Sequence, residues 1–164
     1  MVKVKESELV VAGTQGMDEF IQVFTKEYEL AMADSFSMEQ LNAEQHTLLA
    51  YHYFLKEVVE GGFCQLIQNG YGPYIFDNPF AKVMRMWGLK DFSKLIYKAK
   101  TIYDAHKEDL VKERTEDEFM AMYEEYEVFD EIEEEFMEME EMTTMLIASY
   151  IEEHIDDFAE VIKE

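Results

Sequence analysis

The chain has 164 residues, of which 48% are hydrophobic and 14% aromatic, so it can bury the core of one ordinary domain. Its 37 acidic residues outnumber its 14 basic residues and give a formal net charge of -23. A surface this negative lacks the cations that contact phosphate, which argues against direct binding of nucleic acid or of an anionic membrane.

The cysteine content and the hydropathy pattern exclude further classes. A single cysteine, Cys64, rules out an internal disulfide and a multi-cysteine metal site. The chain has no run of 18 apolar residues, and its first 20 residues lack an apolar segment typical of a signal peptide. We therefore expect a soluble, cytoplasmic protein.

The negative charge is concentrated in the last third of the chain. Residues 1–107 hold 14 acids and 11 bases, whereas residues 108–164 hold 23 acids and only 3 bases, which are Lys112, Arg114 and Lys163. Apolar residues recur in this acidic third every three or four positions, from Phe119 to Ile151. This period indicates amphipathic helices whose solvated faces carry the acids.

The predicted elements begin with a helix over Met17–Ala33. A second helix follows Asn42, an N-cap with Gln45 at the capping-box position, and ends at Gly61–Gly62. We expect a positive φ at one of these two glycines, because a left-handed residue commonly closes a helix. Residues 63–68 should add one or two helical turns, and residues 69–73 should form a tight loop.

The second half of the chain also has a helical pattern. Asn78-Pro79 predicts the start of a helix that ends at Gly88, and Asp91 opens the next one. The acidic third should supply two to four more helices, with Asp130 as the cap of a helix over 131–139. Because Gly and Pro do not occur after Gly88, the sequence predicts an all-α fold: a single irregular multi-helix domain over residues 1–164.

Catalytic and metal-binding signatures are missing from the sequence. It contains no His-Glu-x-x-His or Glu-x-x-His pair, no EF-hand loop, no Gly-x-Ser-x-Gly, and no Gly-rich phosphate loop. Cys64 with His46 or His52 is the remaining nucleophile–base hypothesis, although a lone cysteine in an apolar segment is usually a buried hydrophobe. We predict a non-enzymatic protein with no catalytic residue, no metal site and no cofactor.

One segment is more specific than packing requires. Residues 57–72 read Glu-Val-Val-Glu-Gly-Gly-Phe-Cys-Gln-Leu-Ile-Gln-Asn-Gly-Tyr-Gly. They resemble the hallmark of the DMP-type DNA-mimic protein family, Glu-Val-x-Asn-Gly-Gly-Phe-x-Gln-Phe-Phe-x-Asn followed by a short Ser/Gly turn. The departures are Glu60, Leu66-Ile67, and Gly70-Tyr71 in the turn. The residues that match it in register are Glu57, Val58, Gly61, Gly62, Phe63, Gln65 and Asn69. A weaker resemblance covers about residues 42–154.

The resemblance implies an all-helical fold. In at least part of the family it also implies a surface that imitates DNA and occupies the DNA-binding face of a regulator. The motif itself has a structural interpretation, in which two glycines allow a sharp turn, Phe63 enters the core, and Gln65 and Asn69 satisfy loop backbone. We therefore assign partner binding to acids of the last third: Glu116, Asp117, Glu124, Glu127, Asp130, Glu133, Glu134, Glu138 and Glu141.

The amount of charge is compatible with mimicry. The net -20 of the acidic third equals the charge on about 34 Å of duplex axis. The expected partner is a basic protein, with a DNA-binding transcription regulator as the leading hypothesis. Two alternatives stay open: an immunity-type inhibitor of a basic toxin or nuclease, and a small-ligand-binding or enzymatic domain with a pocket near residues 61–72.

Overall fold

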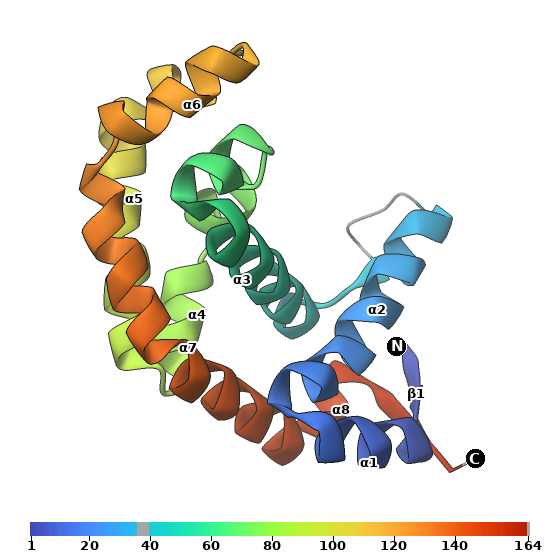
Figure 1. The fold of residues 1–164 in the computed structure, drawn as a ribbon. Coiled ribbons are helices and arrows are strands. Elements are labelled where there is room, and N and C mark those ends of the chain that lie inside the picture. The colour runs from blue at the N-terminus through green and yellow to red at the C-terminus, as the bar shows by residue number, and fades with distance from the viewer. Residues whose placement is uncertain (36–39, 164) are drawn as a thin grey trace. The chain divides into compact units, whose positions relative to one another are not determined.

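The computed structural model describes residues 1–35 and 40–163, and it is helical over most of that length. Two short strands are the exception, since β1 pairs with β2 in parallel register, Val4 opposite Val161. The fold is therefore all-α, as the sequence predicts. In chain order the elements of Figure 1 are β1 (Lys3–Lys5), α1 (Glu6–Gln15), α2 (Met17–Ser35), α3 (Ala43–Gln68), the π-helix η2 (Pro73–Asp77), α4 (Phe80–Met86), α5 (Lys90–Val111), α6 (Glu116–Glu125), α7 (Val128–Glu153), α8 (Ile155–Phe158) and β2 (Glu160–Ile162).

The chain forms two compact units. The first comprises Met1–His52 with Met142–Glu164, and the second comprises Tyr53–Glu141. The helices α3 and α7 each contribute one part to each unit. Whether the two units fold as one domain stays a prediction.

The first unit joins the two ends of the chain around an apolar core. The Tyr28 hydroxyl and the Gln45 amide both donate hydrogen bonds to the Phe158 carbonyl, at 2.7 and 2.9 Å. The Tyr51 and Thr144 hydroxyls lie 2.7 Å apart, both buried. These bonds satisfy polar groups inside a core that includes Phe24, Leu48, Ile147 and Ile151.

The second unit is built on packed phenylalanines. Phe54 lies at their centre, with ring centroids 4.9 Å from Phe136, 5.3 Å from Phe92 and 5.8 Å from Phe63. All four side chains are fully or almost fully buried. Edge-to-face pairs of this kind add stability beyond that of the buried area, so the cluster ties α3, α5 and α7 together inside this unit.

The predicted start of α3 and the predicted break at Gly61–Gly62 are both confirmed. Asn42 and Gln45 make the reciprocal capping-box hydrogen bonds, at 2.8 and 2.9 Å. At the other end, Gly62 adopts φ 73 and ψ -170 and breaks the helix, after which residues 63–68 continue it in a new direction. A residue with a side chain would be strained in this conformation, which explains why position 62 is a glycine.

Several local predictions are wrong. Asp130 does not cap a helix, because α7 already begins at Val128 and continues unbroken to Glu153. The helix α1 and both strands have no predicted counterpart, since α1 is weakly amphipathic and each strand has only three residues. The predicted loop after Asn69 exists as a turn with positive φ at Gly70, but it leads directly into η2. Within the described residues, no helix combines the length and apolarity that crossing a bilayer requires.

Candidate interaction surface

The polar residues of the Gly-Gly-Phe motif bind one another. The Glu57 carboxylate is buried on α3 and accepts hydrogen bonds from the side-chain amides of Gln65 and Asn69, at 2.7 and 3.0 Å. We expected Gln65 and Asn69 to satisfy loop backbone, and this detail is wrong. Both amides donate to the motif's own carboxylate instead. These two hydrogen bonds offset the free-energy cost of burying that acid.

A second acid lies on the other side of the same bend. Glu133 of α7 is half-buried and accepts a 2.7 Å hydrogen bond from the backbone N–H of Phe63. This N–H directly follows the non-helical residue Gly62, so Glu133 caps the short helical segment 63–68. Burial raises the pKa of Glu133, with Asp130 adding to the rise and the Phe63 hydrogen bond opposing it.

The remaining motif residues are also held by local contacts. The Tyr123 hydroxyl donates a 2.8 Å hydrogen bond to the Gly61 carbonyl, and Phe63 stacks on Phe129 at 5.2 Å. Cys64 is buried, and this burial raises the pKa of its thiol to about 12. The thiol is therefore neutral at ordinary pH, which does not favour the hypothesis of a cysteine nucleophile.

The structure places all nine predicted binding acids in the second unit, on α6, on the turn after it and on the first half of α7. Glu133 differs from the others because its carboxylate has the internal partner just described. The other eight side chains are exposed. We call these eight the acidic surface: Glu116, Asp117, Glu124, Glu127, Asp130, Glu134, Glu138 and Glu141.

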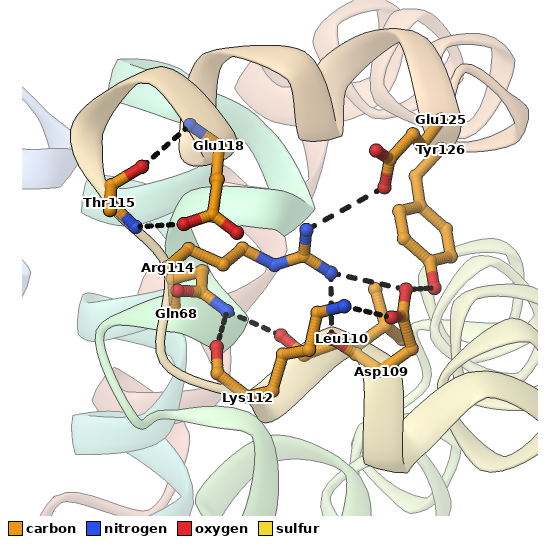
Figure 2. Close-up of polar contacts among 9 residues, drawn as sticks. All are labelled: Gln68, Asp109, Leu110, Lys112, Arg114, Thr115, Glu118, Glu125 and Tyr126. Carbon is orange, nitrogen blue, oxygen red and sulfur yellow. Dashed lines mark hydrogen bonds and ion pairs between the residues drawn. The ribbon is translucent and has the colours of Figure 1, made fainter.

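Two of the cations near this surface are bound to other acids (Figure 2). Arg114 lies between α5 and α6, with its guanidinium 3.1 Å from Asp109 and 3.6 Å from Glu125. Its side chain is only 3% exposed. Lys112 pairs with Asp109 at 2.9 Å. In the part of the chain that the structure describes, none of the eight acids of the acidic surface forms an ion pair.

Contacts around Arg114 hold the two ends of α6. Asp109 also accepts a hydrogen bond from the Tyr126 hydroxyl, and the bonds from Lys112 and Tyr126 lower the pKa of Asp109 to about 2. At the start of α6, Thr115 and Glu118 form a capping box that lowers the pKa of Glu118. Gln68 donates hydrogen bonds to the Leu110 and Lys112 carbonyls and so joins this corner to α3 (Figure 2).

The sequence missed two partners of acids in the last third. Lys98 of α5 lies 3.0 Å from Glu135 of α7, and Phe63 is the partner of Glu133. Both partners are distant in sequence, at separations of 37 and 70 residues, so no local spacing could have revealed them. The three bases within residues 108–164 are therefore not the only partners of the acids in this third.

An open hollow lies beside the same corner. Its lining comprises Gln68, Glu118 and residues 111–115. None of the seven residues that match the motif lines this hollow, and Glu57, Gln65 and Asn69 face one another instead. Gln68 belongs to the segment 61–72 and does line the hollow, so the alternative of a ligand pocket near these residues stays a hypothesis.

Comparison with known proteins finds the same family that the Gly-Gly-Phe motif resembles. The model of the family described as DMP19-like protein matches residues 39–154, which include the Gly-Gly-Phe segment and the whole acidic surface. A similar curated protein is the "DNA mimic protein DMP19" of Neisseria meningitidis serogroup B (strain ATCC BAA-335 / MC58). It is 35% identical to this chain over 128 residues, which cover 76% of each protein.

Proposed function

The chain belongs to the family of DMP19-like proteins, and from this premise we propose that it is a DNA mimic whose acidic surface occupies the DNA-binding face of a basic protein. In this proposal the chain is a non-enzymatic competitor of duplex DNA. The partner is a DNA-binding regulator whose cationic face contacts α6 and the first half of α7.

The observation that carries the proposal is the set of eight exposed carboxylates without an ion pair among the described residues. Lys112 and Arg114 are bound to Asp109 and Glu125, so they do not neutralise this set. Its counterions must come from solution or from a partner. A basic protein that replaces them releases ions and gains entropy, as DNA-binding proteins do when they bind phosphates.

The number of the acids is compatible with recognition by a face made for phosphates. Eight charges correspond to about 14 Å of duplex axis, or somewhat less than half a helical turn. They are carried by helices whose ends are fixed, α6 by the Thr115–Glu118 capping box and by Arg114. Charges on a preformed helix require little further ordering of the backbone on binding, which favours affinity.

The test is competition between this protein and duplex DNA for one partner. Proteins retained from native lysate on the immobilised chain are released by rising salt, and a released DNA-binding protein is purified. We expect duplex DNA and this chain to displace each other from that protein, with an apparent affinity of the chain that falls steeply as salt rises. If the partner binds the chain and DNA at the same time, the proposal is wrong.

A charge variant locates the contact. Replacing Glu134, Glu138 and Glu141 by Gln should weaken binding, whereas Gln at the exposed acids Glu6, Glu8 and Glu153 changes net charge equally and should have a much smaller effect. Equal losses from both variants would show that only the total charge matters. That result would contradict a contact at α7.

A further inference from the structure

The acidic surface contains exposed methionines as well as carboxylates. Met120 is 61% exposed on α6, one helical turn after Glu116 and one turn before Glu124. Met137 is 46% exposed on α7, one turn after Glu134 and one turn before Glu141. On each helix the thioether therefore shares the solvated face with the acids that flank it.

Exposed methionines among acids would add an attraction of another kind. Carboxylates attract cations over a distance of about 10 Å at 0.1 M salt, and this attraction weakens as salt rises. A methionine attracts apolar groups only on contact, and that contact is insensitive to moderate salt. Its unbranched, polarisable side chain also adapts to irregular partner surfaces. Charge alone would not require such residues at these positions.

We propose that Met120 and Met137 are apolar contacts of the acidic surface, and that the surface binds a basic protein helix with an apolar side chain among its lysines and arginines. This inference rests on the proposed function and specifies the chemistry of its partner. The complementary pattern is the one a groove-reading helix needs, because duplex DNA presents thymine methyl groups between its phosphates. The methionines take the place of these methyl groups, and the flanking acids take the place of the phosphates.

The test uses two defined helical peptides of equal positive charge. Both carry lysines along one face; one has a leucine in the middle of that face, and the other has a glutamine there. Their affinity for the full chain is measured by fluorescence anisotropy at about 0.01 M and about 0.1 M salt, where the Debye length is about 30 and 10 Å. The chain is used as the parent, as M120Q/M137Q, and as the control M86Q, whose methionine is 70% exposed on α4. Gln keeps the helix propensity and the length of Met.

We expect the parent and M86Q to prefer the leucine peptide by about 3- to 10-fold at both salt concentrations, a ratio typical of one buried apolar contact. M120Q/M137Q should bind the two peptides equally and should retain the salt dependence of the parent. Equal affinity of the parent for the two peptides, a preference that survives in M120Q/M137Q, or binding of neither peptide would each overturn this inference.

Failure here is distinguishable from failure of the proposed function. If the parent binds both peptides equally and salt weakens both, the methionines are not contacts, but the electrostatic attraction required for mimicry is present. If the natural partner binds the chain and duplex DNA together, the proposed function is wrong whatever the peptides show.

Discussion

Two groups of acids in the second unit look alike in sequence and differ in structure. Glu57 and Glu133 lie at the Gly-Gly-Phe bend, where each accepts hydrogen bonds from inside the unit. The eight acids of the acidic surface are exposed and lack an ion pair among the described residues. The number of acids therefore overstates the size of the binding surface, because some carboxylates stabilise the fold that presents the others.

The largest expected effect is at Gly62. Alanine there adds a Cβ to a residue with φ 73 and brings it against the Glu133 carboxylate. We expect a loss of about 2–4 kcal/mol of unfolding free energy, from the left-handed conformation and from overpacking together. Thermal unfolding should show a melting temperature lower by about 5–15 °C.

Two other glycines are the controls for this variant. Gly70 has φ 90 but open space around it, so Gly70→Ala should cost only the backbone strain of about 1–2 kcal/mol. Gly13 lies inside α1 in open space, and Gly13→Ala should stabilise the protein by about 0.5–1 kcal/mol. A Gly62→Ala variant that melts like Gly70→Ala would show that the Glu133 carboxylate moves aside without cost.

The next largest effect is at Glu57. Glu57→Ala removes the acceptor of the Gln65 and Asn69 amides, and Gln65 is half-buried. We expect a loss of about 1–3 kcal/mol in urea unfolding, since the half-buried Gln65 amide is left without this acceptor. Glu60→Ala is the control: it removes an exposed acid on the same helix, and its effect should stay within about 0.5 kcal/mol. Equal midpoints for the two variants would contradict the structural role of Glu57.

A smaller and pH-dependent effect is expected at Glu133. Burial raises the pKa of Glu133 in the folded state, so folding favours its protonated form. The stability that protonated Glu133 contributes is therefore lost as pH rises through the folded pKa. Glu133→Gln keeps an oxygen that can accept the Phe63 N–H and removes the charge. At pH 7 the unfolding free energy of this variant should therefore equal or exceed that of the parent. Any difference between the two proteins should vanish near pH 4.

The second variant at this position separates the hydrogen bond from the charge. Glu133→Ala has no acceptor for the Phe63 N–H and should lose about 1–3 kcal/mol at both pH values. Chemical unfolding at pH 4 and pH 7 measures both variants. If Glu133→Gln is as destabilised as Glu133→Ala, the carboxylate contributes in a way that a hydrogen bond does not explain.

The smallest effect on stability is expected at the acidic surface. Glu134, Glu138 and Glu141 are exposed and lie one turn apart on α7. Their replacement by Gln should change unfolding free energy by less than about 0.5 kcal/mol, with a slight gain from relieved repulsion between like charges. Circular dichroism melting is the measurement, and a clear loss of stability would show that these acids have structural partners.

The sequence predicted the elements whose signals are local. The capping box at Asn42 and Gln45, the break at Gly61–Gly62 and the amphipathic period of the acidic third were enough to predict helices and the all-α class. The α7 start was missed because Asp130 is a good cap residue by type, whereas the chain already enters the helix at Val128. A residue of a type that often caps helices marks a helix start only where its own backbone is not already helical.

The candidate site was predictable only in part, for a related reason. Exposure of acids follows from the amphipathic period, and eight of the nine predicted acids are exposed. The pairing of Glu133 with Phe63 and of Glu135 with Lys98 depends on tertiary contacts that no spacing encodes. The bend at Gly62 produces the N–H that Glu133 caps, so this acid could be assigned only once the direction of segment 63–68 was known.

The most direct test of this division is the salt dependence of partner binding for three proteins: the parent, the variant with Gln at Glu134, Glu138 and Glu141, and Glu133→Gln. The slope of log affinity against log salt counts the ions released on binding. We predict a smaller slope and weaker binding for the triple variant, and an unchanged slope for Glu133→Gln, whose carboxylate is bound to Phe63 inside the unit. An unchanged slope for the triple variant, or an equal loss per charge in Glu133→Gln, would contradict the account.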